Sequence, residues 1–326
     1  MRLLALLHRP TTDPAGAERM LHQMMLSAAL AGHRAIVGVT RTGPLPDPID
    51  GIEHRPATTP AEIAALVSDS DIVATHLDAT IAALRACKGL VPVVIVEHNT
   101  FVQHKRLLRV EGGPAAIVFN SLWMRDDYER TVPMVRGLPR VVVRPPSFSR
   151  GYRTDRGHLV TQINLFENKG GSLFWRIAAA MPGTNFLAVK GGYGAQVVPA
   201  AVPPNVEVMD PVMDPRAIYA RTGVLLVPST YESWGRVGVE AMASGIPVVA
   251  HPTPGLVESL SYAGVFRGRD DAGGWVTAIT ALQLPDVYER CSELALLRSH
   301  ELDEVFTADL DGWLSLLDQV ANRARS

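Results

Sequence analysis

The stretch Val224–Ala250, VLLVPSTYESWGRVGVEAMASGIPVVA, decides the fold class. Its first four residues are apolar and predict a buried strand, and the run Ile246–Ala250 predicts a second one. A loop between them leads to a short helix, which starts near Gly235 and which Gly245 and Pro247 bring to an end. Strand, loop, helix and strand in this order are the repeating unit of a parallel α/β sheet.

The loop before this helix is the first candidate site, because ligands of open parallel sheets bind outside the carboxyl ends of the strands. The backbone N–H groups of Gly235, Arg236 and Val237 would lie at the positive end of the helix dipole, which favours a phosphate. Glu232 precedes them and Glu240 lies eight residues further on. Carboxylates repel an anion, so we expect both to accept hydrogen bonds from sugar hydroxyls. Taken singly, each has a plainer interpretation, a partner for a helix N-terminus or a solvated surface charge.

The segment ESWGRVGVEAMASGIPVVA resembles the Glu-x7-Glu signature of the retaining nucleotide-sugar glycosyltransferases of family 4, with Glu232 and Glu240 as its two glutamates. This resemblance implies the GT-B fold, an α/β fold in which two Rossmann-like doubly wound parallel-sheet domains face a central cleft. It also implies that Glu240 holds ribose hydroxyls, that Glu232 holds sugar hydroxyls, and that transfer retains the anomeric configuration without an enzyme nucleophile.

Length and composition agree with such a protein. The 326 residues suffice for two domains, and 47% hydrophobic with 20% charged residues is typical of a soluble globular chain. A net charge of −2 gives no overall basic field for nucleic acid. The two cysteines, Cys87 and Cys291, form no disulfide framework, which points to the reducing cytoplasm. No apolar run reaches the ~20 residues of a membrane helix, so we expect peripheral membrane contact at most.

Apolar segments that alternate with polar or helical ones predict the two sheets. The first set comprises Leu3–Leu7, Ala35–Val39, Asp71–Thr75, Val91–Val96, Ala115–Phe119 and Val141–Val143. The second comprises Leu159–Ile163, Asn185–Val189, Val206–Val208, Val224–Val227, Ile246–Ala250 and Gly264–Phe266.

The Pro-, Ser- and Gly-rich segment Arg144–Gly157 breaks this periodicity and predicts the hinge. We therefore expect an N-terminal acceptor-binding domain at 1–146, a C-terminal nucleotide-sugar-binding domain at 147–302, and a final helix at 303–326 that packs back on the first domain.

Three residues of the first domain are candidates for the site. His98 follows the strand that VPVVIVE predicts, where the family commonly has a histidine beside the reacting sugar; it would orient acceptor hydroxyls or accept a proton. His76, at the end of another strand, is the second choice. Gly16 lies in a strand-to-helix turn, where the family's glycine loop covers the donor phosphates, although an ordinary turn explains it as well.

An Asp-x-Asp pair at Asp69 and Asp71 resembles the metal-binding mark of a different glycosyltransferase fold. Here the pair leads into a strand instead of leaving one. We interpret Asp71 as a strand-entry residue and predict no metal.

HLVTQINLFENKGG resembles the family segment in which a strand ends at an Arg and a Lys-Gly pair follows. Lys169 and Gly170 match the pair, whereas Asn164 stands where the Arg is usual. An Asn donates hydrogen bonds without charge, so either Arg236 or another cation substitutes, or the leaving diphosphate is less stabilised.

The resemblance thus implies a nucleotide-diphosphate sugar as substrate, no cofactor, and His98, Lys169 and Glu232 as catalytic residues.

One stretch of the chain is strongly basic. Gln103–Arg156 carries eleven Lys and Arg against five Asp and Glu residues. Such an excess attracts an anionic acceptor, such as a glycan, a lipid-linked glycan, a protein or a modified nucleic acid, or a membrane surface, although separate solvated faces explain it too. A sugar-nucleotide epimerase or hydrolase of the same fold, and a non-catalytic sugar-nucleotide-binding protein, remain alternatives.

Overall fold

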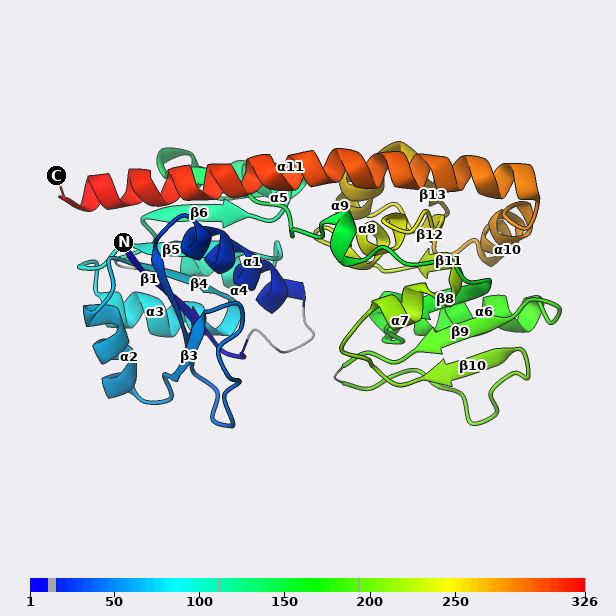
Figure 1. Ribbon diagram of the computed structural model, residues 1–326, viewed down its shortest axis with the longest axis horizontal. Helices are drawn as coiled ribbons and strands as arrows, with labels where there is room; N and C mark the ends of the chain where they lie inside the picture. Colours follow the sequence, from blue (N-terminus) through cyan, green and yellow to red (C-terminus); the bar gives the residue numbers. More distant parts are fainter. Residues whose placement is uncertain (11–15, 111, 193, 326) are drawn as a thin grey trace. The chain divides into compact units, whose positions relative to one another are not determined.

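The computed structural model describes residues 1–10, 16–110, 112–192 and 194–325. The chain divides into two compact units. Unit 1 comprises Met1–Pro146 and Phe306–Ser326, and unit 2 comprises Ser147–Val305. Each is built on one parallel sheet, blue to cyan for unit 1 and green to yellow for unit 2 in Figure 1.

Unit 1 has a seven-stranded sheet in the order β3-β2-β1-β4-β5-β6-β7, and every neighbouring pair is parallel. Its strands are β1 Arg2–Leu7, β2 Arg34–Val39, β3 Glu53–Pro56, β4 Ile72–His76, β5 Val93–Glu97, β6 Ala116–Phe119 and β7 Arg140–Val142. Its helices are α1 Gly16–Leu30, α2 Pro60–Ser68, α3 Thr80–Cys87, α4 Val102–Leu107 and α5 Leu122–Thr131, with short 3-10 turns at Leu77–Ala79 and Pro133–Gly137.

Side chains of the central strand β1 alternate between two cores, because successive residues of a strand point to opposite faces. Leu3, Ala5 and Leu7 pack with α1 on one face, whereas Leu4 and Leu6 pack with α2, α3 and α5 on the other. Helices on both faces of a parallel sheet make this unit doubly wound.

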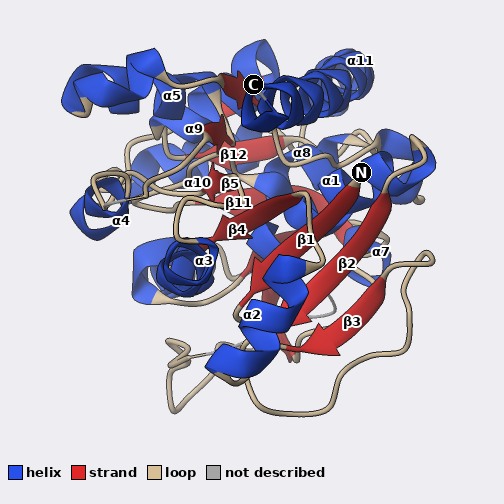
Figure 2. Cartoon of the chain, turned by 90° about the vertical axis from the view of Figure 1, so that its left-hand side faces the viewer, coloured by secondary structure: helices blue, strands red, loops and turns tan. Residues whose placement is uncertain are grey.

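One strand of unit 1 was not predicted from the sequence. Glu53–Pro56 forms the edge strand β3 beside β2, and Figure 2 shows β3, β2, β1 and β4 side by side. Its sequence, EHRP, lacks an apolar run, because only His54 of its four side chains is buried. An edge strand with one partner can end in a proline, which has no N–H to donate.

Unit 2 has a six-stranded parallel sheet in the order β10-β9-β8-β11-β12-β13. Its strands are β8 Leu159–Ile163, β9 Phe186–Val189, β10 Val206–Met209, β11 Thr222–Val227, β12 Val248–Ala250 and β13 Gly264–Phe266. Its helices are α6 Gly171–Ala180, α7 Arg216–Tyr219, α8 Arg236–Met242, α9 Pro254–Leu260 and α10 Ala272–Ala281, with 3-10 turns at Ser149–Gly151, Glu167–Lys169 and Ser261–Ala263. All twelve predicted strands are present, with bounds within two residues of those expected.

The long helix α11, Pro285–Arg325, contributes to both units, since the boundary falls between Val305 and Phe306. Trp313 is fully buried in the core of unit 1 with Leu317 and Val320, and its Nε1 donates a hydrogen bond of 3.0 Å to the carbonyl of Met24 in α1. In the described part of the chain, no helix combines the length and the apolar character needed to cross a bilayer.

Candidate functional site

The carboxyl edge of the unit 2 sheet brings two loops together. The loop after β8 carries Lys169 and the loop after β11 carries Glu232, and Lys169 Nζ lies 2.5 Å from Glu232 Oε1. Ser229 donates a hydrogen bond of 2.8 Å from its hydroxyl to the same carboxylate oxygen. The backbone N–H of Thr230 donates to the carbonyl of Asn168, which joins the two loops directly. Two residues 63 positions apart in the sequence thus form one ion pair at the edge where ligands of such sheets bind.

Glycine at position 170 permits this close approach. Gly170 has a φ of +89°, a conformation that L-residues rarely adopt, and a Cβ there would lie 2.4 Å from Cγ of Pro228. Pro228 directly precedes the serine that contacts Glu232. The Lys-Gly pair therefore supplies both the cation and the backbone shape that brings it to the carboxylate.

Glu240 lies on α8 and is only 5% exposed, so it is not a solvated surface charge. The hydroxyl of Tyr219 donates to Glu240 Oε2 at 2.8 Å, and Arg236 Nε donates to Glu240 Oε1 at 3.1 Å. Arg236 Nη2 donates further to the hydroxyl of Tyr152 at 2.8 Å. Burial, and then the neighbouring Glu240, raises the pKa of Tyr219 well above its usual value, so its hydroxyl remains a donor.

The charge of Arg236 is balanced within this network by Glu240. Gly235, with φ +92°, precedes α8, whose first turn contains Arg236 and Val237 as predicted. Leu256 of α9 packs against this turn, since a Cβ on Gly235 would lie 2.5 Å from its Cδ2. The first turn of α8 is therefore packed against a second helix, α9.

Asn164, where the family resemblance would have an arginine, shapes the backbone. It has φ +70°, a region that Asn tolerates better than most residues, and its Oδ1 accepts a hydrogen bond of 3.1 Å from the N–H of Phe166. This bond identifies the other amide atom as the NH₂ group, for which the described residues offer no acceptor. Asn164 thus presents a neutral donor, without the positive charge of an arginine.

Several residues that support these loops were missed at the sequence level. Gln162 Nε2 donates to the carbonyls of Asn164 and Lys169, and Gln196 Oε1 accepts from the N–H groups of Leu165 and Gly191. Gln196 ends the glycine-rich loop 191–196, of which position 193 lies outside the described residues. Neither glutamine gives a sequence signal for such bonds, because the partners are backbone atoms.

In unit 1, His98 follows β5, and its Nε2 lies 3.0 Å from Nδ1 of His76, the last residue of β4. Burial lowers the pKa of His76 to about 3. Burial, followed by the neighbouring His76 and His104, lowers the pKa of His98 well below its usual value. Both rings are therefore neutral at pH 7.

Gly16 is the first residue of α1, and residues 11–15 before it lie outside the described part of the chain. Asp71 accepts hydrogen bonds from the backbone N–H and the guanidinium of Arg2, which agrees with its interpretation as a residue at the start of a strand. Among the described residues, no three His, Cys, Asp or Glu side chains form a group that could hold a metal ion.

Among the described residues of the basic stretch Gln103–Arg156, six of the cations form ion pairs. These are Lys105, Arg125, Arg130, Arg140, Arg144 and Arg156. Arg144, for example, contacts Asp309 at 2.9 Å. Four of these cations pair with acids of the same stretch, which the excess already counts. Only Arg144 and Arg156 pair with acids outside it, so these two pairs alone reduce the excess.

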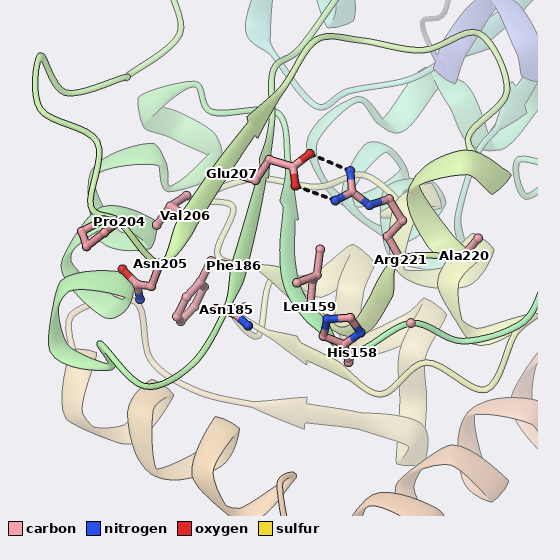
Figure 3. Close-up of a pocket in the computed structure, with 11 residues that line it drawn as sticks. His158, Leu159, Asn185, Phe186, Pro204, Asn205, Val206, Glu207, Ala220 and Arg221 are labelled. Carbon is pink, nitrogen blue, oxygen red and sulfur yellow. Dashed lines mark hydrogen bonds and ion pairs between the residues drawn. The ribbon is translucent and has the colours of Figure 1, made fainter.

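Unit 2 also contains a pocket of about 640 Å³ at the opposite edge of its sheet (Figure 3). Leu159, Phe186 and Val206, the first residues of β8, β9 and β10, line it together with the paired Arg221 and Glu207. None of the predicted site residues lines this pocket. They lie instead at the carboxyl edges of the two sheets or on the helices that follow.

Comparison with known proteins agrees with this arrangement. Residues 167–283, which contain Lys169, Glu232 and Glu240, match the family model described as glycosyl transferases group 1. A segment of 76 residues is 34% identical to the O-antigen chain mannosyltransferase RfbU of Salmonella typhimurium, and covers 23% of this chain and 22% of that protein. A segment of 74 residues is 36% identical to the D-inositol 3-phosphate glycosyltransferase of Corynebacterium kroppenstedtii, and covers 22% of this chain and 16% of that protein. The matches thus span less than a quarter of each relative.

Solved structures resemble the whole chain. The structure of HepE from Anabaena, in complex with UDP and glucose, has a TM-score of 0.77 at 17% identity and covers 100% of both chains. Sucrose-phosphate synthase from Thermosynechococcus elongatus has a TM-score of 0.71 at 15% identity, covering 100% of this chain and 98% of that one. The fold is GT-B. The prediction of two Rossmann-like parallel-sheet domains is confirmed.

Proposed function

We propose that this protein is a glycosyltransferase that moves a sugar from a nucleotide-diphosphate donor to an acceptor, with retention of configuration and without a metal ion. The observation that carries the proposal is the meeting of Lys169, Glu232 and Ser229 at the carboxyl edge of the unit 2 sheet. The group 1 match over residues 167–283 supports it, as do the names of the relatives and the UDP bound to HepE.

The donor's diphosphate is the leaving group, and it departs without being protonated because it is a weak base. Lys169 stabilises the negative charge that develops on it, and the first turn of α8, at Gly235, Arg236 and Val237, adds backbone donors. Asn164 adds a neutral donor from its NH₂ group. When the donor binds, the ion pair between Lys169 and Glu232 breaks: Lys169 contacts the diphosphate, and Glu232 accepts hydrogen bonds from the sugar hydroxyls.

Glu240 can bind the ribose, but only through the acceptor positions that its protein partners leave open. Each of its oxygens already accepts one hydrogen bond, from Tyr219 and from Arg236, and each carboxylate oxygen has a second lone pair. A ribose hydroxyl would take that second position on a carboxylate that is already rigidly oriented. Preorganisation of this kind lowers the cost of ordering the group when the donor binds.

His98 orients an acceptor hydroxyl or accepts its proton, as a neutral imidazole can. The acceptor is proposed to be an anionic glycan, lipid-linked glycan, protein or modified nucleic acid. Its support is the excess positive charge of Gln103–Arg156, which the ion pairs of Arg144 and Arg156 with acids outside this stretch reduce only in part.

The test is a panel of nucleotide sugars with the protein of residues 1–326, first by thermal shift and then by release of nucleoside diphosphate in the presence of candidate acceptors. UDP-sugars come first, because HepE binds UDP. The NMR coupling constant of the product's anomeric proton reports retention or inversion. Binding without release of diphosphate would favour a non-catalytic binding protein, and release that requires no acceptor would favour a hydrolase or epimerase. No shift with any nucleotide sugar would reject the proposal.

A further inference from the structure

Two histidines at the carboxyl edge of the unit 1 sheet lie side by side. His76 ends β4 and His98 follows β5, and these two strands are parallel neighbours. The Nδ1 atom of His76 lies 3.0 Å from Nε2 of His98, and the rings meet edge to face with centroids 5.0 Å apart. The distance is that of a hydrogen bond.

The two rings differ in their surroundings. His76 is 2% exposed, so it is part of the protein interior, whereas His98 is partly exposed. Because Nε2 of His98 lies at hydrogen-bond distance from His76, Nδ1 is the ring nitrogen of His98 that remains for a substrate.

The proton arrangement follows from the chemistry of neutral imidazole, in which one nitrogen donates and the other accepts. His76 and His98 are both neutral at pH 7, for the reasons given above. The other titratable groups that act nearby are His104 of α4, which lowers the pKa of His98, and Asp78, which acts on His104. The Nε2–H form is the lower-energy tautomer of an isolated histidine side chain. If both rings adopt it, His98 Nε2–H donates to His76 Nδ1 without conflict.

We propose that His76 is a positioning residue for His98: by accepting the hydrogen bond from Nε2–H, it fixes the ring and leaves the Nδ1 lone pair of His98 to accept a hydrogen bond from a substrate hydroxyl. The effect on turnover rests on the proposed function, whereas the tautomer is a property of the ligand-free protein. A ring nitrogen whose tautomer is set by its partner is a known device for orienting histidines.

The direct test is a two-bond ¹H–¹⁵N correlation spectrum of the histidine rings in the ligand-free protein of residues 1–326 at pH 7. We expect His98 to be protonated at Nε2 and unprotonated at Nδ1. The signals are assigned with His98→Gln. An Nδ1–H in the wild-type protein would overturn the proposal whatever the variants do.

Two substitutions at position 76 separate positioning from packing. His76→Phe keeps an aromatic ring and removes the acceptor, so His98 should become a mixture of tautomers. His76→Asn keeps an acceptor close to the place of Nδ1, so its Oδ1 should preserve the Nε2–H form. A His98 spectrum that stays unchanged in His76→Phe, with a wild-type thermal midpoint, would exclude the positioning role. If His76→Phe does not fold, loss of the Nε2–H form in His76→Asn serves as the contrary result.

Kinetics give the functional half of the test. In a transfer assay we expect His76→Phe to lower kcat roughly 10-fold with the donor KM unchanged, a part of the 10²–10⁴-fold that an acid–base group supplies. His76→Asn should recover most of that loss. If the spectra are as expected but no nucleotide sugar is turned over, the proposed function fails and the positioning of His98 stands. If transfer occurs and His76→Phe changes neither spectrum nor kcat, the positioning fails alone.

Discussion

The hydroxyl of Tyr219 donates a hydrogen bond of 2.8 Å to Oε2 of Glu240, and both side chains are buried. This contact joins α7, the helix before β11, to α8, which carries the second glutamate of the signature. Tyr219→Phe should therefore lower the free energy of unfolding by about 2 kcal/mol, because it removes a bond to a charged group. Tyr288→Phe serves for comparison: its hydroxyl donates to the neutral carbonyl of Gly223 at 2.9 Å, with Arg156 over its ring, and about 1 kcal/mol is expected. Urea unfolding measures both losses of free energy. Equal losses would mean that the bond to Glu240 stabilises the protein no more than a bond to a neutral carbonyl does.

Lys169 and Lys190 both follow strands at the carboxyl edge of the unit 2 sheet, but only Lys169 contacts Glu232. If the proposed function holds, Lys169→Met should lower kcat roughly 10²–10³-fold, the effect of losing one donor to a developing charge, with a smaller change in donor KM. Lys190→Met removes a cation paired with the exposed Asp210 and should leave kcat within about two-fold. Steady-state release of nucleoside diphosphate distinguishes them, and a comparable loss in both would argue against a specific role of Lys169.

Gly170 and Gly32 share a φ of +89° but differ in their surroundings. A Cβ on Gly170 would meet Pro228, whereas a Cβ on Gly32 would meet nothing within 4 Å. Gly32→Ala should cost about 1 kcal/mol of stability through backbone strain alone, and Gly170→Ala about 2–4 kcal/mol because overpacking is added. Denaturant midpoints measure the difference, which would vanish if the loop could move away from Pro228.

Glu97, 3% exposed at the end of β5, should make stability depend on pH. Burial raises its pKa from 4.5 to about 7, against smaller opposing effects of Tyr128 and Lys105. Since the folded-state pKa is the higher one, the contribution of Glu97 is fully present below about pH 4.5 and is lost as the pH rises to about 7. Its size is on the order of 3 kcal/mol.

The geometry around Glu97 fits a protonated acid. The hydroxyl of Tyr128 lies 2.8 Å from Glu97 Oε2 and 2.9 Å from the carbonyl oxygen of Asn99, and its single proton can serve one of these acceptors. A protonated Glu97 can donate to Tyr128, which then donates to Asn99. Glu97→Gln keeps a donor at all pH values, so unfolding curves from pH 4.5 to 8 should show a shallower fall with pH than in the wild-type protein. Parallel curves would contradict the assignment.

A chelator should leave transfer unchanged if Lys169 and the first turn of α8 stabilise the diphosphate as proposed. The measurement is diphosphate release with and without EDTA, followed by addition of Mg²⁺ or Mn²⁺. Activity that EDTA abolishes and a divalent ion restores would reject the metal-free mechanism.

The strands could be predicted because their signal is local: a buried parallel strand is a short apolar run between turn residues, as at Leu159–Ile163, whose predicted bounds are those of β8. The edge strand β3 was not predicted, because a strand at the edge of a sheet does not need an apolar run. The signature glutamates and the Lys-Gly pair could be found from their spacing, but not the contact between Lys169 and Glu232. That contact depends on the close packing of Gly170 against Pro228, and these two residues are 58 positions apart in the sequence.

The sequence by itself determined the alternation of strands and helices, and with it two parallel sheets whose carboxyl edges carry the polar loops. Only the tertiary structure decided which polar groups are paired there: Glu240 with Tyr219 and Arg236, His98 with His76, and Asn164 with the backbone of its own turn. The physical reason is the separation in the sequence of the residues that interact. Secondary structure follows from hydrophobic period and turn residues a few positions apart, whereas a hydrogen bond between side chains depends on atoms that only folding brings within about 3 Å.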